Sequence, residues 1–305
     1  MPHKNLIRPP SLRSGDKVGI VAPARKVSRE EIAPAIDAIG SWNYVVVEGK
    51  HLYGSNSQYS GTDDQRASDF QAMLDDPGIK AIFCARGGYG SVRIIDRLDF
   101  SAFRKSPKWI VGYSDITVFH SHIPGHFGIE TLHACMPINF PGDRKMNESL
   151  NSLKRILEGE DVSYAIPPHE FNRNGISNGQ LCGGNLSMLY SLSGTSSDID
   201  TEGKILFIED LDEYLYHIDR MMMNLKRSGK LKNLAGLVVG GMNDMNDNEI
   251  PFGKTAYEII AESAAEYNYP VLFGFPAGHI PNNRALIMGG EYELGVGRES
   301  SFRLL

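Results

Sequence analysis

The stretch that decides the fold is KWIVGYSDITVFH, residues 108–120. A run of β-forming residues, 109–112, leads directly into Tyr113, Ser114 and Asp115, and a segment with helical spacing follows. A serine on a tight turn from strand to helix exposes its hydroxyl, and the next backbone N–H lies at a helix N-terminus, where it can bind a developing oxyanion. Serine at such a position more often simply caps the helix. This stretch alone leaves both interpretations open.

Short β-branched segments alternate with helix-length segments on both sides of this stretch. The alternation predicts a mainly parallel β-sheet with helices on its faces. In such a sheet the functional loops follow the carboxyl ends of the strands, and both RGGYGS (86–91) and GYSD (112–115) have that position. We expect strands at 17–23, 44–49 and 79–85, and helices at 28–42 and 63–74.

The pattern of strands and helices loosens between residues 139 and 180, where proline, glycine and asparagine are frequent. This loosening predicts two α/β domains, the first at 1–145 and a second, smaller one at 176–305, joined by a linker at 146–175. The last segment, 285–305, alternates apolar and polar residues in the way that a terminal β-hairpin does.

Composition argues against several classes of function. The chain of 305 residues carries a net charge of −6 and has no basic cluster, so binding to nucleic acid or to an anionic membrane surface is not expected. No apolar run approaches the roughly 20 residues that cross a bilayer, and the N-terminal segment lacks the apolar region of a signal peptide. The three cysteines, Cys84, Cys135 and Cys182, are odd in number and far apart, which predicts no disulfide framework. We expect a cytoplasmic protein.

A serine nucleophile needs a base that accepts its proton and an acid that orients this base. Of the nine histidines, His279 is the strongest candidate for the base, because it follows a short apolar strand in a loop rich in glycine and proline. His133 follows a strand-like segment and is a second candidate for a place near the site, whereas His217 is expected to be solvated. A helix after the serine would carry three more histidines away from it, at about 1.5 Å per residue: His120, His122 and His126.

The segment KILFIEDLDEY, residues 204–214, supplies the candidate acid. Its apolar run from Ile205 ends on Glu209, and a carboxylate in that position needs a partner because burying it unpaired is costly. A salt bridge would satisfy this need equally well, and Asp210 or Asp212 could serve as the acidic charge at a helix N-terminus. The residues alone therefore leave a catalytic and a structural role open for Glu209.

Three other motifs suggest different chemistry. The turn RGGYGS resembles a dinucleotide or phosphate loop, but it lacks the G-x-G-x-x-G spacing and the P-loop lysine, and its N–H groups could equally complete an oxyanion hole. The histidines after Ser114 suggest a metal site, yet no HExxH is present and positions i and i+2 of a helix diverge. Nothing marks Cys135 as an activated thiol. We therefore expect no metal site and no thiol nucleophile.

Taken together, these motifs resemble the LD-carboxypeptidase family of serine peptidases, which includes muramoyltetrapeptide carboxypeptidases and microcin C immunity-type peptidases. The resemblance covers nearly the whole chain, and it depends on several motifs in the same order. These motifs lie at 8–24, 61–74, 82–96, 107–120, 181–189, 205–222 and 275–279.

The resemblance implies an N-terminal α/β domain and a C-terminal domain with the active site in the cleft between them. It implies a Ser–Glu–His triad of Ser114, Glu209 and His279, with Glu213 as the alternative acid if the match around the EDLDEY turn is displaced. The family's oxyanion hole corresponds here to the backbone N–H groups of Gly88 and Asp115. Neither a cofactor nor a metal is implied.

By the same resemblance, the substrate is a cytosolic murein tetrapeptide that loses its terminal D-alanine during peptidoglycan recycling, and the protein is a homodimer. A microcin-type substrate, an aminoacyl-nucleotide conjugate, is the alternative, because both subfamilies share the triad. An α/β-hydrolase esterase would require a glycine where Ile116 stands. A non-catalytic small-molecule binding protein would keep its function without Ser114.

Overall fold

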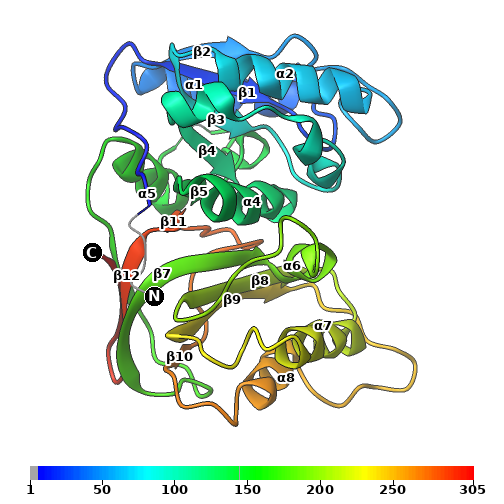
Figure 1. The fold of residues 1–305 in the computed structure, drawn as a ribbon, viewed down its shortest axis with the longest axis vertical. Coiled ribbons are helices and arrows are strands. Elements are labelled where there is room, and N and C mark those ends of the chain that lie inside the picture. The colour runs from blue at the N-terminus through cyan, green and yellow to red at the C-terminus, as the bar shows by residue number, and fades with distance from the viewer. Residues whose placement is uncertain (1–5, 144) are drawn as a thin grey trace.

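Two β-sheets, one above the other in Figure 1, organise the chain. The computed structural model describes residues 6–143 and 145–305. The N-terminal and the C-terminal parts each combine one sheet with helices, which confirms the predicted fold class of two α/β domains.

The first sheet contains six strands. They are β1 (Lys17–Val21), β2 (Val45–Glu48), β3 (Ile79–Cys84), β4 (Trp109–Gly112), β5 (Thr131–His133) and β11 (Leu286–Met288). Their order across the sheet is β11-β5-β4-β3-β1-β2. All neighbours are parallel except β11 and β5, which pair antiparallel. The parallel arrangement predicted from the alternating segments is confirmed, and it brings the carboxyl ends of β3 and β4 to one edge.

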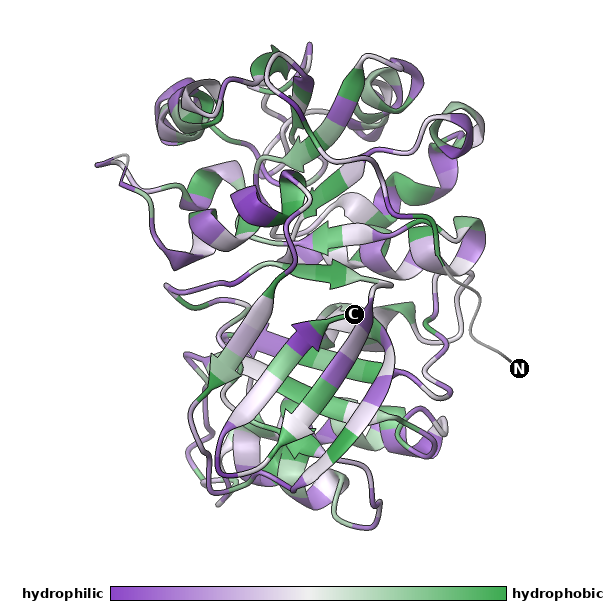
Figure 2. Cartoon of the chain, turned by 90° about the vertical axis from the view of Figure 1, so that its left-hand side faces the viewer, coloured by the Kyte–Doolittle hydropathy of each residue, from purple (hydrophilic) through white to green (hydrophobic). Residues whose placement is uncertain are grey.

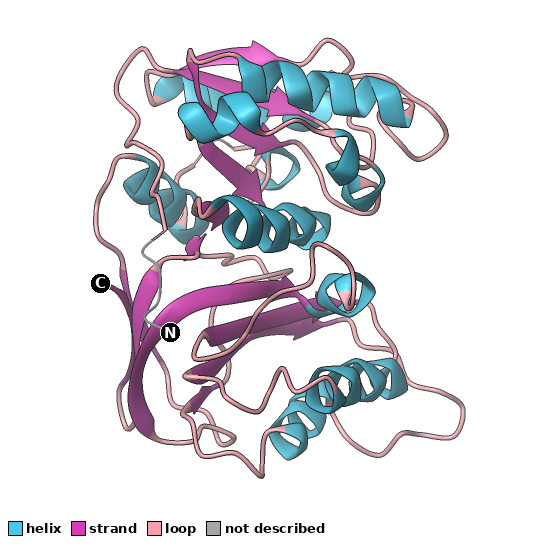
Figure 3. Ribbon diagram, in the orientation of Figure 1, coloured by secondary structure: helices cyan, strands magenta, loops and turns pink. Residues whose placement is uncertain are grey.

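Helices cover both faces of the first sheet (Figure 3). They are α1 (Arg29–Ser41), α2 (Asp63–Asp75), α3 (Ser101–Lys105), α4 (Thr117–Phe127) and α5 (Glu148–Leu157). α1 and α5 pack on one face, and α2, α3 and α4 pack on the other. Capping boxes start the two long predicted helices, through Ser28 and Glu31 at α1 and through Thr62 and Gln65 at α2.

The second sheet contains seven strands, in the order β10-β9-β8-β7-β12-β13-β6. They are β6 (Ser163–Ile166), β7 (Gly175–Asn185), β8 (Ile205–Leu211), β9 (Gly236–Asn243), β10 (Val271–Leu272), β12 (Glu291–Val296) and β13 (Ser300–Leu304). β7 to β10 are parallel, and the antiparallel pair of β12 and β13 confirms the expected terminal hairpin. One face carries α6 (Leu186–Leu192), α7 (Leu215–Arg227) and α8 (Ala256–Ser263). Within residues 6–143 and 145–305, no helix has the length and apolar character of a membrane span.

A cluster of buried hydrophobic residues extends from the first domain into the second. It includes Trp109 and Val111 of β4 and continues to Tyr292 and Phe302 of the second sheet. Figure 2 shows apolar residues on strands of both sheets. α4 of the first domain packs directly against β7 of the second. Burial of apolar surface therefore holds the two sheets against each other.

Two features of the chain path were not visible in the sequence. The segment 146–175, expected to link the domains, contains α5 and β6. The C-terminal part of the chain returns to the first sheet through β11, where Leu286 pairs with His133. Local periodicity carries no information about a pairing between residues so far apart in the chain.

Gly183 in β7 offers a test of how tightly the second sheet is packed. Its φ of +117° disfavours other residues, and a Cβ there would overlap the carbonyl oxygen of Phe207 on the neighbouring strand. We expect Gly183→Ala to lower the free energy of unfolding by about 3 kcal/mol or more. Gly194→Ala is the control, because its φ is +77° but nothing lies within 4 Å of the added Cβ. Equal midpoints of urea denaturation for both variants would contradict the role of the strand contact.

Candidate active site

Ser114 lies on a strained turn between β4 and α4. The strand ends at Gly112, and Ser114 begins a short 3₁₀ turn, Ser114–Ile116, that leads into α4. Its φ of +64° lies in the left-handed region, which is unfavourable for any residue with a Cβ. A Cβ at Gly112 would lie 2.8 Å from Cγ1 of Ile116, so the turn needs glycine there. This geometry is that of a nucleophile elbow, formed even though Ile116 replaces the second glycine of the usual motif.

The glycine-rich loop after β3 lies against this turn. A Cβ at Gly87 would lie 3.1 Å from Ser114 Oγ, so the loop backbone directly borders the hydroxyl. The backbone N–H of Ser91 donates to Oδ2 of Asp115 at 2.8 Å, which ties the loop to the residue after the serine. Asp115 is fully buried, and burial raises the pKa of its carboxyl despite this hydrogen bond.

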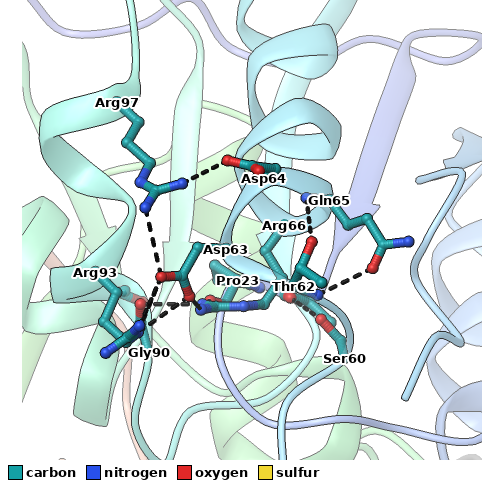
Figure 4. A network of polar contacts seen from close by, with 12 residues as sticks. Pro23, Ser60, Thr62, Asp63, Asp64, Gln65, Arg66, Gly90, Arg93 and Arg97 are labelled. Carbon is teal, nitrogen blue, oxygen red and sulfur yellow. Dashed lines mark hydrogen bonds and ion pairs between the residues drawn. The ribbon is translucent and has the colours of Figure 1, made fainter. Parts of the chain in front are cut away.

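A buried arginine holds the other side of the same loop (Figure 4). The guanidinium of Arg66 donates to the carbonyl oxygens of Pro23 and Gly90 and pairs with Asp63. Arg93 also donates to Asp63, at 2.8 Å, and this hydrogen bond is the main reason that the pKa of Asp63 is lowered. The network fixes the glycine-rich loop relative to the end of β1 and the start of α2.

Glu209 and His279 form a hydrogen-bonded pair in the second domain. Glu209 lies near the end of β8 with a fully buried side chain, and His279 lies in the loop after β10. Oε2 of Glu209 accepts hydrogen bonds from Nδ1 of His279 at 2.7 Å and from its backbone N–H at 3.2 Å. Burial alone would lower the pKa of His279, but the hydrogen bond from Nδ1 to Glu209 and the charges of Glu209 and Asp210 raise it above the ordinary value. Such a pair leaves Nε2 available as a base.

A cavity of about 490 Å³ between the domains brings these two parts together. Ser114 and His279 both line it, and the ring of Tyr113 packs edge-on against the imidazole at 4.8 Å between centroids. Gly88 and Asp115, whose N–H groups are the predicted oxyanion donors, line the same cavity. Among the described residues, Ser114 Oγ has no hydrogen-bond partner, so the hydroxyl is available to a substrate.

The other sequence candidates have separate partners. Glu213, the alternative acid, also lines the cavity, but its carboxylate accepts from Nδ1 of His217 at 2.6 Å. His217 is therefore half-buried and paired, where the sequence predicted a solvated side chain. His133 is fully buried in β5, and burial lowers its pKa well below the ordinary value. Burial raises the pKa of Cys135 to about 12, which keeps this thiol protonated.

The three histidines of α4 contact different groups. His120 bonds to Thr131 and to the carbonyl of Gly112, while the other two reach the segment after α6. In the part of the chain that the structure describes, no group of three or more His, Cys, Asp or Glu side chains could hold a metal ion.

Several cavity residues are not placed at the site by the sequence, and three polar ones are Arg25, Asn185 and Asp210. Nδ2 of Asn185 donates to Oδ1 of Asp210 at 2.9 Å. Burial, together with the nearby charge of Glu209, raises the pKa of Asp210 to about 7. Each of the three lies at or just past the carboxyl end of a parallel strand, so the rule that selected the GYSD and RGGYGS loops could have found them.

Comparison with known proteins identifies the class of this fold and site. Residues 18–134 match the LD-carboxypeptidase N-terminal domain, and residues 178–294 match the LD-carboxypeptidase C-terminal domain. A probable murein peptide carboxypeptidase of Bacillus subtilis is 34% identical over 297 residues, which cover 96% of this chain and 93% of that protein. The chain therefore belongs to the LD-carboxypeptidase family, a family of serine-type carboxypeptidases.

Solved structures agree with this assignment. The muramoyltetrapeptide carboxypeptidase from Oxalobacter formigenes superimposes with a TM-score of 0.86 at 28% identity, covering 94% of this chain and 98% of that one. The microcin C7 self immunity protein, solved with aspartyl sulfamoyl adenosine, gives a TM-score of 0.87 at 21% identity, with 98% of each chain covered. At that identity the second similarity concerns the fold alone.

The raised pKa of His279 can be measured without any substrate. We expect Glu209→Gln to lower the pKa of this imidazole, because the substitution removes the negative charge and weakens the hydrogen bond that favour the protonated ring. NMR titration of labelled histidine would follow the change. Glu213→Gln is the matched control, since Glu213 pairs with His217 instead, and it should leave the titration of His279 unchanged. A larger shift of His279 in the Glu213 variant would contradict the pairing.

Proposed function

We propose that the chain is a serine LD-carboxypeptidase that removes the terminal D-alanine from murein tetrapeptides, with Ser114, Glu209 and His279 as its triad. The observation that carries the proposal is the buried Glu209–His279 pair, whose imidazole lines the same cavity as a serine on a strained turn. The relatives named for murein peptides and muramoyltetrapeptide support this choice of substrate. A place in cytoplasmic peptidoglycan recycling and a homodimeric state belong to the same proposal.

Acylation begins when Nε2 of His279 accepts the proton of Ser114 Oγ. The oxygen attacks the carbonyl carbon before the terminal D-alanine, and the carbonyl oxygen becomes an oxyanion. The N–H groups of Gly88 and Asp115 donate to this oxyanion, and each such donor contributes about 3 kcal/mol to transition-state stabilisation. His279 then gives its proton to the amine as the C–N bond breaks, and D-alanine leaves.

Deacylation repeats the sequence with water. His279 accepts a proton from a water molecule, which attacks the ester, and returns this proton to Ser114 Oγ when the shortened peptide leaves. Glu209 acts through the imidazole in both halves. Its hydrogen bond holds the proton on Nδ1, keeps Nε2 free, and stabilises the imidazolium that forms.

The release of D-alanine from purified murein tetrapeptide tests this proposal. We expect activity from the wild type and a loss of about 10³-fold or more in kcat for Ser114→Ala, Glu209→Ala and His279→Ala. His51→Ala is the matched control, because His51 also pairs with a carboxylate, that of Asp69 at 2.8 Å, but lies outside the cavity lining. An active Ser114→Ala enzyme would contradict the mechanism. A wild type that cleaves only an aminoacyl-nucleotide conjugate would transfer the same triad to a microcin-type substrate.

The pH profile of kcat/KM follows from the base. His279 must be neutral to accept the proton of the serine, so activity falls as the pH decreases through its raised pKa. In the Glu209→Gln variant, the residual kcat/KM should still fall at acidic pH. This fall, the acidic limb of the profile, should occur at lower pH than in the wild type, because the substitution lowers the pKa of the His279 imidazole. The limb should coincide with the pKa of His279 from the NMR titration. An identical limb in both enzymes would assign it to another group.

A further inference from the structure

We propose that Arg25 binds the terminal carboxylate of the peptide substrate. The inference rests on the proposed function, because it assigns the part of the cavity that recognises the leaving residue. A carboxypeptidase must distinguish a chain end from a peptide bond within a chain, and the negative charge of the end is what differs. The cavity therefore needs a cation close to the reacting carbonyl.

Arg25 lies next to the predicted oxyanion hole. Its backbone N–H donates to the carbonyl of Gly87 at 3.3 Å, so its loop is joined to the glycine-rich loop. Its side chain crosses Gly88: a Cβ at that glycine would lie 3.3 Å from Nε of Arg25 and closer still to Cδ. The guanidinium thus begins beside the residue whose N–H is the predicted oxyanion donor.

The covalent structure of the substrate limits where its carboxylate can lie. Only the nitrogen and Cα of the last residue separate the scissile carbonyl carbon from the carboxylate carbon, which keeps them within about 4 Å of each other. With the carbonyl oxygen held at Gly88 and Asp115, the carboxylate lies within a few ångströms of the oxyanion hole. The guanidinium of Arg25, whose Cδ and Nε lie beside Gly88, can reach that position.

The charges around the cavity favour Arg25 over its neighbour. Two arginines line the cavity, but the guanidinium of Arg86 already has a partner, the carboxylate of Glu31 at 3.6 Å. Among the described residues, the guanidinium of Arg25 has no hydrogen-bond or ion-pair partner. It is also exposed to solvent, and so it is accessible to an entering substrate.

Acidic side chains from the second domain line the cavity, so an anionic chain end needs an unpaired cation in order to bind there. Asp212 and Glu213 line the cavity from the second domain, and their negative charges oppose the entry of an anionic chain end. A guanidinium compensates for this repulsion and can form two parallel hydrogen bonds with a carboxylate. Arg25 then gives the acidic cavity its preference for a free carboxylate.

Two substrates that differ only at the chain end test the proposal: the tetrapeptide acid and the same peptide ending in D-alaninamide. We expect the wild type to prefer the acid in kcat/KM, and Arg25→Gln to lose about 10- to 100-fold on the acid and little on the amide. Arg25→Lys should recover part of the preference, because lysine keeps the charge but not the paired hydrogen bonds. Lys26→Gln removes the neighbouring charge, which contacts Ser55 and lies outside the cavity lining, and should behave as the wild type.

Binding separates a failure of this inference from a failure of the proposed function. In a Ser114→Ala background, calorimetry compares the affinities for the acid and the amide with and without Arg25→Gln, whether or not the wild type turns over. Loss of the acid preference on removal of Arg25 supports the assignment. An Arg25→Gln enzyme that weakens both ligands equally, or an acid preference that disappears only in Arg86→Gln, overturns it. A wild type that binds the acid selectively but releases no D-alanine would reject the proposed reaction alone.

Discussion

A fully buried carboxylate, that of Glu209, is the constraint on which the arrangement of the site depends. A carboxylate removed from water destabilises the fold strongly unless donors replace its hydration. Oε2 of this carboxylate accepts two hydrogen bonds, both from His279, through its backbone N–H and Nδ1. Gly240 and Gly278 leave room for the side chain of Glu209. A Cβ at Gly240 would lie 3.2 Å from Cβ of Glu209, and a Cβ at Gly278 would lie 2.6 Å from its Oε2. Glu209 thereby fixes both the loop that carries His279 and the orientation of its imidazole.

Hydrogen bonds extend this constraint across the domain interface. The backbone N–H of Asn185, at the end of β7, donates to Oγ1 of Thr117 at 3.0 Å, at the start of α4. The side-chain amide of Asn185 donates to Oδ1 of Asp210, the residue that follows Glu209. A Cβ at Gly184 would lie 2.5 Å from Oγ1 of Thr117. The backbone of β7 therefore packs directly against the start of α4, with no room for a side chain between them. The buried Asn185 therefore links α4, the helix after Ser114, to β8, the strand that carries Glu209.

The sequence predicts the local elements of this protein well and its long-range contacts poorly. Helices 28–42 and 63–74 were expected and form at Arg29–Ser41 and Asp63–Asp75, because capping residues and apolar spacing act within a few residues. The return of β11 to the first sheet is a tertiary pairing without a local signal. Likewise, the residues themselves left Glu209 open between catalytic and structural roles, and only the family resemblance joined it to His279. Arg25 carried no signal beyond its place after a strand.

The return of β11 joins the part of the chain that carries His279 to the sheet that carries Ser114. In the first sheet, His133 of β5 pairs with Gly112 of β4 on one side and with Leu286 of β11 on the other. Gly112 leads directly into the turn of Ser114, and the chain reaches Leu286 shortly after His279. His133 is consequently buried at the centre of this three-strand junction, which accounts for its neutral, inaccessible imidazole. Strand pairing thus tethers the loop that carries His279 to the sheet that carries Ser114.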